Sequence, residues 1–172
     1  MPNVPRRVVT GHDAQGNSVF VQDGQAPVVR TAPDGAYFYE LWNTGAMPAP
    51  ITPTEPEPTE RDLTVPPATN GTKIRINEFP PGVISPTHRT QTVDYGIVLE
   101  GEVVLVLDNE ADTVLSAGDV VIQRGTDHRW ENRTENVARM AFILVDGQFT
   151  DELVQAIGAD AVGGLLHDPM KP

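Results

Sequence analysis

An all-β fold, an antiparallel sandwich or barrel, is predicted by three features of the sequence. Apolar runs of four to eight residues recur between Lys73 and Asp146. Short turn sequences, among them LEGE, SAGD and QRGTD, separate these runs. The chain of 172 residues contains no cysteine, yet it is long enough to bury a core without cross-links. Short strands at regular spacing with tight turns are typical of sandwiches and barrels.

The chain divides into four segments. Residues 1–46 are expected to form an N-terminal β-hairpin or arm, because apolar residues flank a turn built from Asp13, Gly16 and Asn17. Residues 47–71 are rich in proline and glutamate and predict an extended connecting loop, since proline removes backbone donors.

Residues 72–147 hold the predicted barrel, with strands in KIRINEF, DYGIVLE, EVVLVLD, DTVLS, DVVIQ, HRWEN and VARMAFILVD. Residues 148–172 predict a C-terminal helix and tail. Thr150 is suited to cap that helix, and Gly158 is suited to end it.

The formal net charge of −12 argues against a nucleic-acid partner, because an acidic surface repels phosphate backbones. The N-terminus lacks the apolar run of a signal peptide, and no stretch approaches the ~20 apolar residues of a membrane span. We therefore expect a cytoplasmic protein with no membrane partner.

The stretch SPTHRTQTVDYGIVLEGE places polar residues on alternate positions: His88, Thr90, Thr92 and Asp94. On a strand they would share one face, which is either a site or the wet side of a sheet. A straight strand would hold the first and last of them roughly 20 Å apart, too far to share a ligand. A common site therefore requires the chain to bend near Gln91.

A second segment, GDVVIQRGTDHRWEN, predicts a strand, a turn at Gly125 and another strand that opens at His128. The parity of His128, Trp130 and Asn132 predicts that these three side chains face inward together. A lone inward histidine is more often a core residue than a ligand. Two histidines and a carboxylate in one small β-domain are a more specific pattern.

Both segments resemble the two motifs of the cupin family, whose fold is the double-stranded β-helix or jelly-roll barrel, also called RmlC-like. In the first motif, His88 follows Gly82 after five residues, and Gly101 follows Asp94 after six. Thr90 stands where the family has a second histidine, and Asp94 stands where it has glutamate. In the second motif, Gly118, Gly125, His128 and Asn132 match, although the turn is one residue short.

The resemblance implies a small-molecule enzyme with a divalent metal ion, Fe, Mn, Ni or Zn, held by His88, Asp94 and His128. Two histidines and one carboxylate with open positions suit non-haem iron. Thr90 would hydrogen-bond a ligand or water, and Arg124 would pair with a substrate carboxylate. The substrate would be an oxygenated aromatic, keto or carboxylate metabolite.

Two alternatives stay open at this point. In a metal-free enzyme, Asp94 and His128 would exchange protons as acid and base. In a binding protein, the barrel would hold a small ligand without turnover. Cupins are often dimers, so a homodimer is expected, and the aromatic cluster of residues 37–42 would either close the pocket or pack against the barrel exterior or a second subunit.

Overall fold

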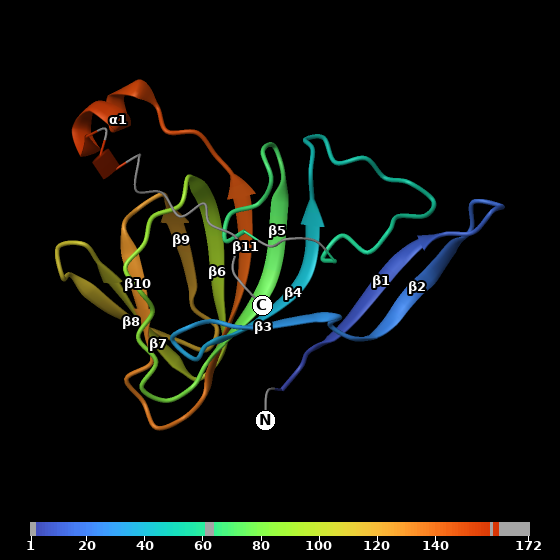
Figure 1. The fold of residues 1–172 in the computed structure, drawn as a ribbon. Coiled ribbons are helices and arrows are strands. Elements are labelled where there is room, and N and C mark those ends of the chain that lie inside the picture. Colours follow the sequence, from blue (N-terminus) through green and yellow to red (C-terminus); the bar gives the residue numbers. More distant parts are fainter. Residues whose placement is uncertain (1–2, 61–63, 159, 162–172) are drawn as a thin grey trace.

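The structure, a computed structural model, describes residues 3–60, 64–158 and 160–161. Eleven strands and one helix are found there (Figure 1). The strands are β1 (Arg6–His12), β2 (Ser18–Gln25), β3 (Val28–Thr31), β4 (Tyr37–Thr44), β5 (Thr72–Phe79), β6 (Thr92–Glu100), β7 (Glu102–Leu107), β8 (Asp112–Ser116), β9 (Val120–Arg124), β10 (His128–Glu131) and β11 (Ala138–Asp146), and the helix is α1 (Asp151–Ile157).

Two antiparallel sheets form the barrel. The larger has the order β3-β4-β5-β11-β6-β9, and the smaller has the order β10-β7-β8. The sequential strands β6 and β7 lie in different sheets, and so do β8 and β9, so the chain alternates between the two layers. This alternation makes the all-β fold a double-stranded barrel, as predicted.

The hairpin β1–β2 is a separate two-stranded sheet that extends from the side of the larger sheet in Figure 1. Arg7 anchors it through a 2.6 Å ion pair with Glu57 in the connecting loop and a hydrogen bond to the carbonyl of Leu41. The hairpin itself exposes Phe20 and Val21 to solvent.

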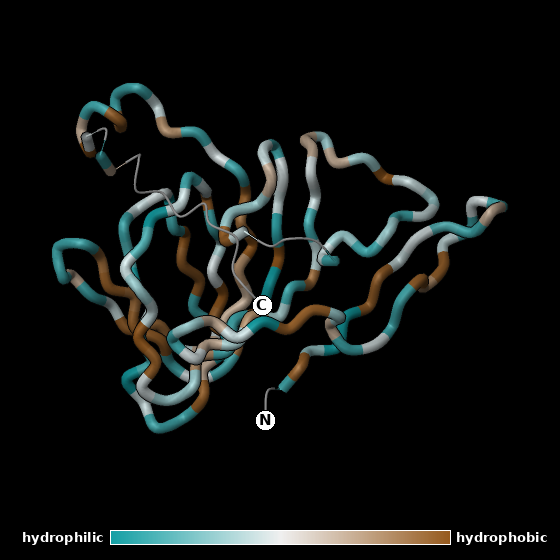
Figure 2. The backbone as a smooth tube through the Cα atoms, in the orientation of Figure 1, coloured by the Kyte–Doolittle hydropathy of each residue, from teal (hydrophilic) through white to brown (hydrophobic). Residues whose placement is uncertain are grey.

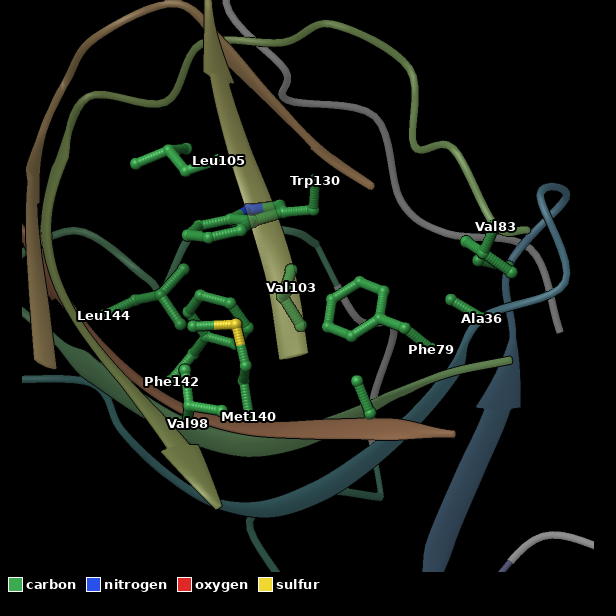
Figure 3. Close-up of a cluster of buried hydrophobic side chains, with 12 residues drawn as sticks. Ala36, Phe79, Val83, Val98, Val103, Leu105, Trp130, Met140, Phe142 and Leu144 are labelled. Carbon is green, nitrogen blue, oxygen red and sulfur yellow. The ribbon is translucent and has the colours of Figure 1, made fainter. Parts of the chain in front are cut away.

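The core lies between the two sheets. Trp130 of β10 contacts Phe142 of β11 edge-to-face, with ring centroids 5.3 Å apart. Figure 3 shows Val103, Phe79 and Met140 grouped with them. In Figure 2 the hydrophobic segments follow the barrel strands, and the turns between those strands are largely hydrophilic. Packing aromatic and branched side chains between the layers stabilises the barrel by removing their surface from water.

Every strand predicted in the barrel is present, and so is the N-terminal hairpin. Thr150 caps α1 by accepting from the amide of Leu153, and Gly158 ends the helix, both as expected. The four-residue strand β3 was not predicted. With β4 it extends the barrel's larger sheet, so that sheet begins well before residue 72. The division into four segments stays a prediction, and most of residues 159–172 lies outside the described residues.

No helix in the described part of the chain has the length and apolar character that crossing a bilayer requires.

Candidate functional site

The predicted bend near Gln91 is where the chain passes from one sheet to the other. Before it, His88 forms an isolated antiparallel bridge with His128, with backbone hydrogen bonds of 2.9 and 3.0 Å. After it, β6 begins at Thr92 in the larger sheet. Asp94 and His88 are therefore carried by opposite walls of the barrel, and both face its interior.

A glycine turn sets the position of His128. Gly125 has φ +62°, and an added Cβ would lie 2.5 Å from Cε1 of Phe149, so the turn needs a residue without a side chain. Gln123 holds the turn through its side-chain oxygen, which accepts from the amide of Gly125. The next strand then starts at His128, and His128, Trp130 and Asn132 are all buried, as their parity predicts.

The two imidazoles are neighbours, with ring centroids 4.4 Å apart. Nδ1 of His88 lies 2.9 Å from the carbonyl of Pro86, which holds a proton on Nδ1 and leaves the lone pair on Nε2. Nδ1 of His128 lies between the carbonyl of Thr126 (3.0 Å) and the amide nitrogen of Gln123 (3.1 Å). The carbonyl favours the tautomer with the proton on Nδ1, and the amide favours the tautomer with the proton on Nε2. The ring of His128 can therefore carry its proton on either nitrogen.

Burial sets the protonation of both histidines. Burial, together with the neighbouring imidazole of His88, lowers the pKa of His128 to about 4. Burial likewise lowers the pKa of His88, against the raising effect of the Pro86 carbonyl. Both rings are therefore neutral near pH 7, and a neutral ring offers a lone pair.

Asp94 is a buried carboxylate with an unusual environment. Only 7% of its surface is exposed, and its Oδ1 has no hydrogen-bond partner. Burial raises the pKa of Asp94 to about 6, while a hydrogen bond with Thr92 and the charge of Arg75 oppose that rise. Thr92 in turn shares a 2.8 Å hydroxyl hydrogen bond with Thr90, so a short polar chain leads from Thr90 to the carboxylate.

All four of these predicted residues, His88, Thr90, Asp94 and His128, line one cavity of about 560 Å³ between the sheets. A cavity of this size accommodates a small organic molecule. Its wall is otherwise largely apolar, and includes Ala32, Pro33, Phe38, Val65, Phe79, Pro86, Trp130, Phe142 and Leu144.

Arg124 does not belong to this cavity, contrary to the sequence prediction. Alternation along β9 buries Gln123 and leaves Arg124 exposed on the outer face. The arginine that does line the cavity is Arg75 of β5, accompanied by Asn77 on the same face. Both were missed. In KIRINEF, Lys73, Arg75 and Asn77 share the parity of Phe79, but this alternation does not say which face of the strand is the inner one.

The aromatic cluster of residues 37–42 divides between the two faces of β4. Phe38 lines the cavity, which is the first of the two positions considered for this cluster. Tyr39 points to the opposite face, where it is fully buried and its hydroxyl donates to Glu78. Trp42 lies under the guanidinium of Arg7 from the hairpin, 5.9 Å from the ring centroid.

A three-ligand metal centre is not formed by this arrangement of side chains. Within residues 3–60, 64–158 and 160–161, no three histidine, aspartate or glutamate side chains are close enough to ligate one ion. His88 and His128 are adjacent, but Asp94 is on the opposite wall, near the cationic Arg75. The side chains as they stand therefore do not fit the predicted set of His88, Asp94 and His128.

Comparison with known proteins identifies the same type of barrel in this chain. The family model described as Cupin domain matches residues 75–145. A cupin 2 conserved barrel domain protein from Salinispora arenicola has the same fold, with a TM-score of 0.51 at 21% identity over 81% of this chain and 99% of that one.

The curated relatives extend over nearly the whole chain. "Phomopsin biosynthesis cluster protein C'" from Diaporthe leptostromiformis is 37% identical over 98% of this chain and 91% of its own length. "Cupin-domain-containing oxidoreductase virC" from Hypocrea virens is 36% identical over 81% of this chain and 75% of its own length. The chain belongs to the cupin family.

Proposed function

We propose that this chain is a small-molecule enzyme whose substrate binds in the cavity between the two sheets. One observation carries the proposal: two neutral imidazoles and an unpartnered buried carboxylate line the same largely apolar cavity. Titratable groups with shifted pKa values in a concave apolar site are the usual mark of acid–base chemistry. Relatives named as a cupin-domain-containing oxidoreductase and as a biosynthesis cluster protein support a small-molecule enzyme.

The proposed chemistry is proton transfer next to a carbonyl or hydroxyl oxygen of the substrate. Nε2 of His88 or His128 takes a proton from carbon, so an N–H bond forms, the C–H bond breaks and the electron pair stays in the substrate as an enolate. Asp94, whose pKa is raised to about 6, is partly protonated near neutral pH and returns a proton to the substrate. Thr90 acts through Thr92, which hydrogen-bonds the carboxylate and holds it in position.

Deuterium exchange tests this chemistry directly. The probe is 4-hydroxyphenylpyruvate, an aromatic keto acid, incubated in D2O with the protein and followed by mass spectrometry. We expect deuterium uptake beside the keto group above the buffer rate, and loss of that excess in Asp94→Asn and in a variant with both His88→Asn and His128→Asn. Exchange at the buffer rate with folded protein contradicts the proposal, and so does full activity in both variants.

A metal-dependent enzyme is the second candidate, favoured by the paired imidazoles. A hydrogen bond from Nδ1 to a carbonyl, as at His88, is the usual orientation of a metal-ligating histidine that binds through Nε2. Elemental analysis of protein purified without chelator tests this candidate. A stoichiometric transition metal that is lost in His88→Ala supports it, whereas metal content independent of that substitution removes it.

A homodimer and a cytoplasmic location are further parts of the proposal. The exposed Phe20, 77% accessible, and Val21 on the projecting hairpin favour contact with a second copy. Light scattering on the purified protein tests the dimer, and a monomeric mass at micromolar concentration contradicts it.

A further inference from the structure

Arg75 is a buried cation on the wall of the cavity. It lies in the middle of β5, and strand alternation turns its side chain inward with Lys73 and Asn77. Only 6% of its surface is exposed. Removing a guanidinium from water is costly unless it gains partners, so a buried arginine normally carries a full set of hydrogen bonds.

Arg75 lacks that set. Its Nε and Nη1 are both shielded from solvent and have no hydrogen-bond partner. Glu40 and Asp94 act on it through space. Across the described ranges, however, no carboxylate oxygen lies within 4.0 Å of the Arg75 guanidinium. Its close neighbour is instead the ring of Phe38, whose centroid is 4.7 Å from Cζ.

The surroundings suit a flat ligand with a charged end. Phe38 also lines the cavity and presents an aromatic surface beside the guanidinium. Trp130 and Phe142 continue that apolar wall. Asn77, two residues further along β5, has an unpartnered buried Oδ1 that can accept from a hydroxyl group. A carboxylate fits a guanidinium because two parallel N–H groups meet its two oxygens.

We propose that Arg75 is the substrate-recognition residue of this cavity, and that the ligand is an aromatic acid bound through its carboxylate. The inference rests on the proposed function in taking the cavity as the substrate site. The carboxylate of the ligand pairs with the guanidinium, and the apolar body lies against Phe38 and Trp130. This pairing satisfies donors that the chain itself leaves without partners.

Binding of two matched probes tests the inference without any turnover. The probes are 2-naphthoate and its uncharged isostere 2-naphthamide, titrated by calorimetry at pH 7.5. A charge-assisted hydrogen-bonded pair is worth about tenfold or more in affinity, so the wild-type protein should prefer the acid by at least about tenfold. Equal affinity for the two probes overturns the inference, and so does absence of binding by both.

Three variants assign the preference to Arg75. Arg75→Gln should bind the amide as the wild type does and lose the preference for the acid. Arg75→Lys, which keeps the charge without the planar fork, should retain part of it. Arg124→Gln is the matched control, because it removes the same charge from the exposed face outside the cavity, and it should keep the full preference. A preference for the acid that survives Arg75→Gln overturns the inference. If that variant does not fold, the comparison of Arg75→Lys with the wild type decides, and an undiminished preference in Arg75→Lys overturns the inference.

The two proposals fail separately. If the wild-type protein does not catalyse deuterium exchange but still prefers 2-naphthoate to 2-naphthamide, the proposed enzyme is contradicted and the recognition role of Arg75 is not. Exchange that persists with the methyl ester of 4-hydroxyphenylpyruvate as fast as with the acid contradicts the recognition role and leaves the enzyme standing.

Discussion

Replacing Asp94 by asparagine should stabilise the protein at neutral pH while it removes proton transfer. Burial raises the pKa of this carboxyl from 3.8 to about 6, which means that the folded state disfavours the ionised form. The cost is absent below about pH 3, where the group is protonated in both the folded and the unfolded state. It grows as the pH rises and is complete above about pH 7.

The magnitude follows from the size of the shift. A shift of about two units at 1.36 kcal/mol per unit corresponds to about 3 kcal/mol of unfolding free energy at pH 8. Asparagine has nearly the same shape, cannot ionise and keeps an oxygen that accepts from Thr92. For a chain of this length, about 3 kcal/mol corresponds to a melting temperature on the order of 6–12 °C higher.

Calorimetric melting of the wild type and Asp94→Asn from pH 3 to pH 8 measures the effect. We expect the difference in melting temperature to be close to zero at pH 3, to open between about pH 4 and 6, and to be constant above about pH 7. Asp108→Asn is the matched control, since the Asp108 side chain is 62% exposed and should change little at any pH. A difference that is constant with pH, or a variant less stable at pH 8, would refute the reasoning.

Three further substitutions test the framework of the site. Gly125→Ala should cost about 1–3 kcal/mol in urea unfolding, because φ is +62° and the new methyl group would overlap Phe149; a neutral effect would show that the turn is not constrained. Glu131→Gln should cost a similar amount, about 1–3 kcal/mol, since this buried carboxylate bonds two arginines at 2.6 and 2.7 Å; unchanged stability would mean that the network contributes nothing. Arg124→Gln should leave both stability, within about 0.5 kcal/mol, and probe binding unchanged, and a loss of binding would place this arginine in the site after all.

The strands were predictable because their signal is local. Apolar runs between turn residues mark a strand wherever it lies in the sheet, and all the barrel strands follow that rule. The strand β3 escaped it, since its four residues between Pro27 and Pro33 are too short a run to show a period. The bend near Gln91 has no local signal in the sequence. It was predicted only because His88 and Asp94 could not share a site on a straight strand.

The sequence prediction named Arg124 and missed Arg75, because the sequence does not say which face of a strand is the inside. The usual rule turns polar residues outward, and in β5 that rule would bury Ile74 and Ile76 and expose Arg75 and Asn77. The structure does the reverse, since the cavity side of β5 carries its polar residues. At a binding site the polar face of a strand is the inner one, and alternation alone cannot reveal it.

The distance of Asp94 from the two histidines was also beyond the reach of the sequence. The resemblance to cupins implied that all three residues share a site, and in the structure all three line one cavity. Spacing does not fix rotamers or the wall from which each side chain comes, and these decide whether three groups meet at one ion.

A crystal structure with 2-naphthoate bound tests most directly the claim that the cavity between the sheets is the substrate site. The predicted result is density for the naphthyl ring beside Phe38 and Trp130, with both carboxylate oxygens within hydrogen-bond distance of Arg75. Density for the probe only on the outer surface, or in the cavity with its carboxylate turned away from Arg75, would contradict it.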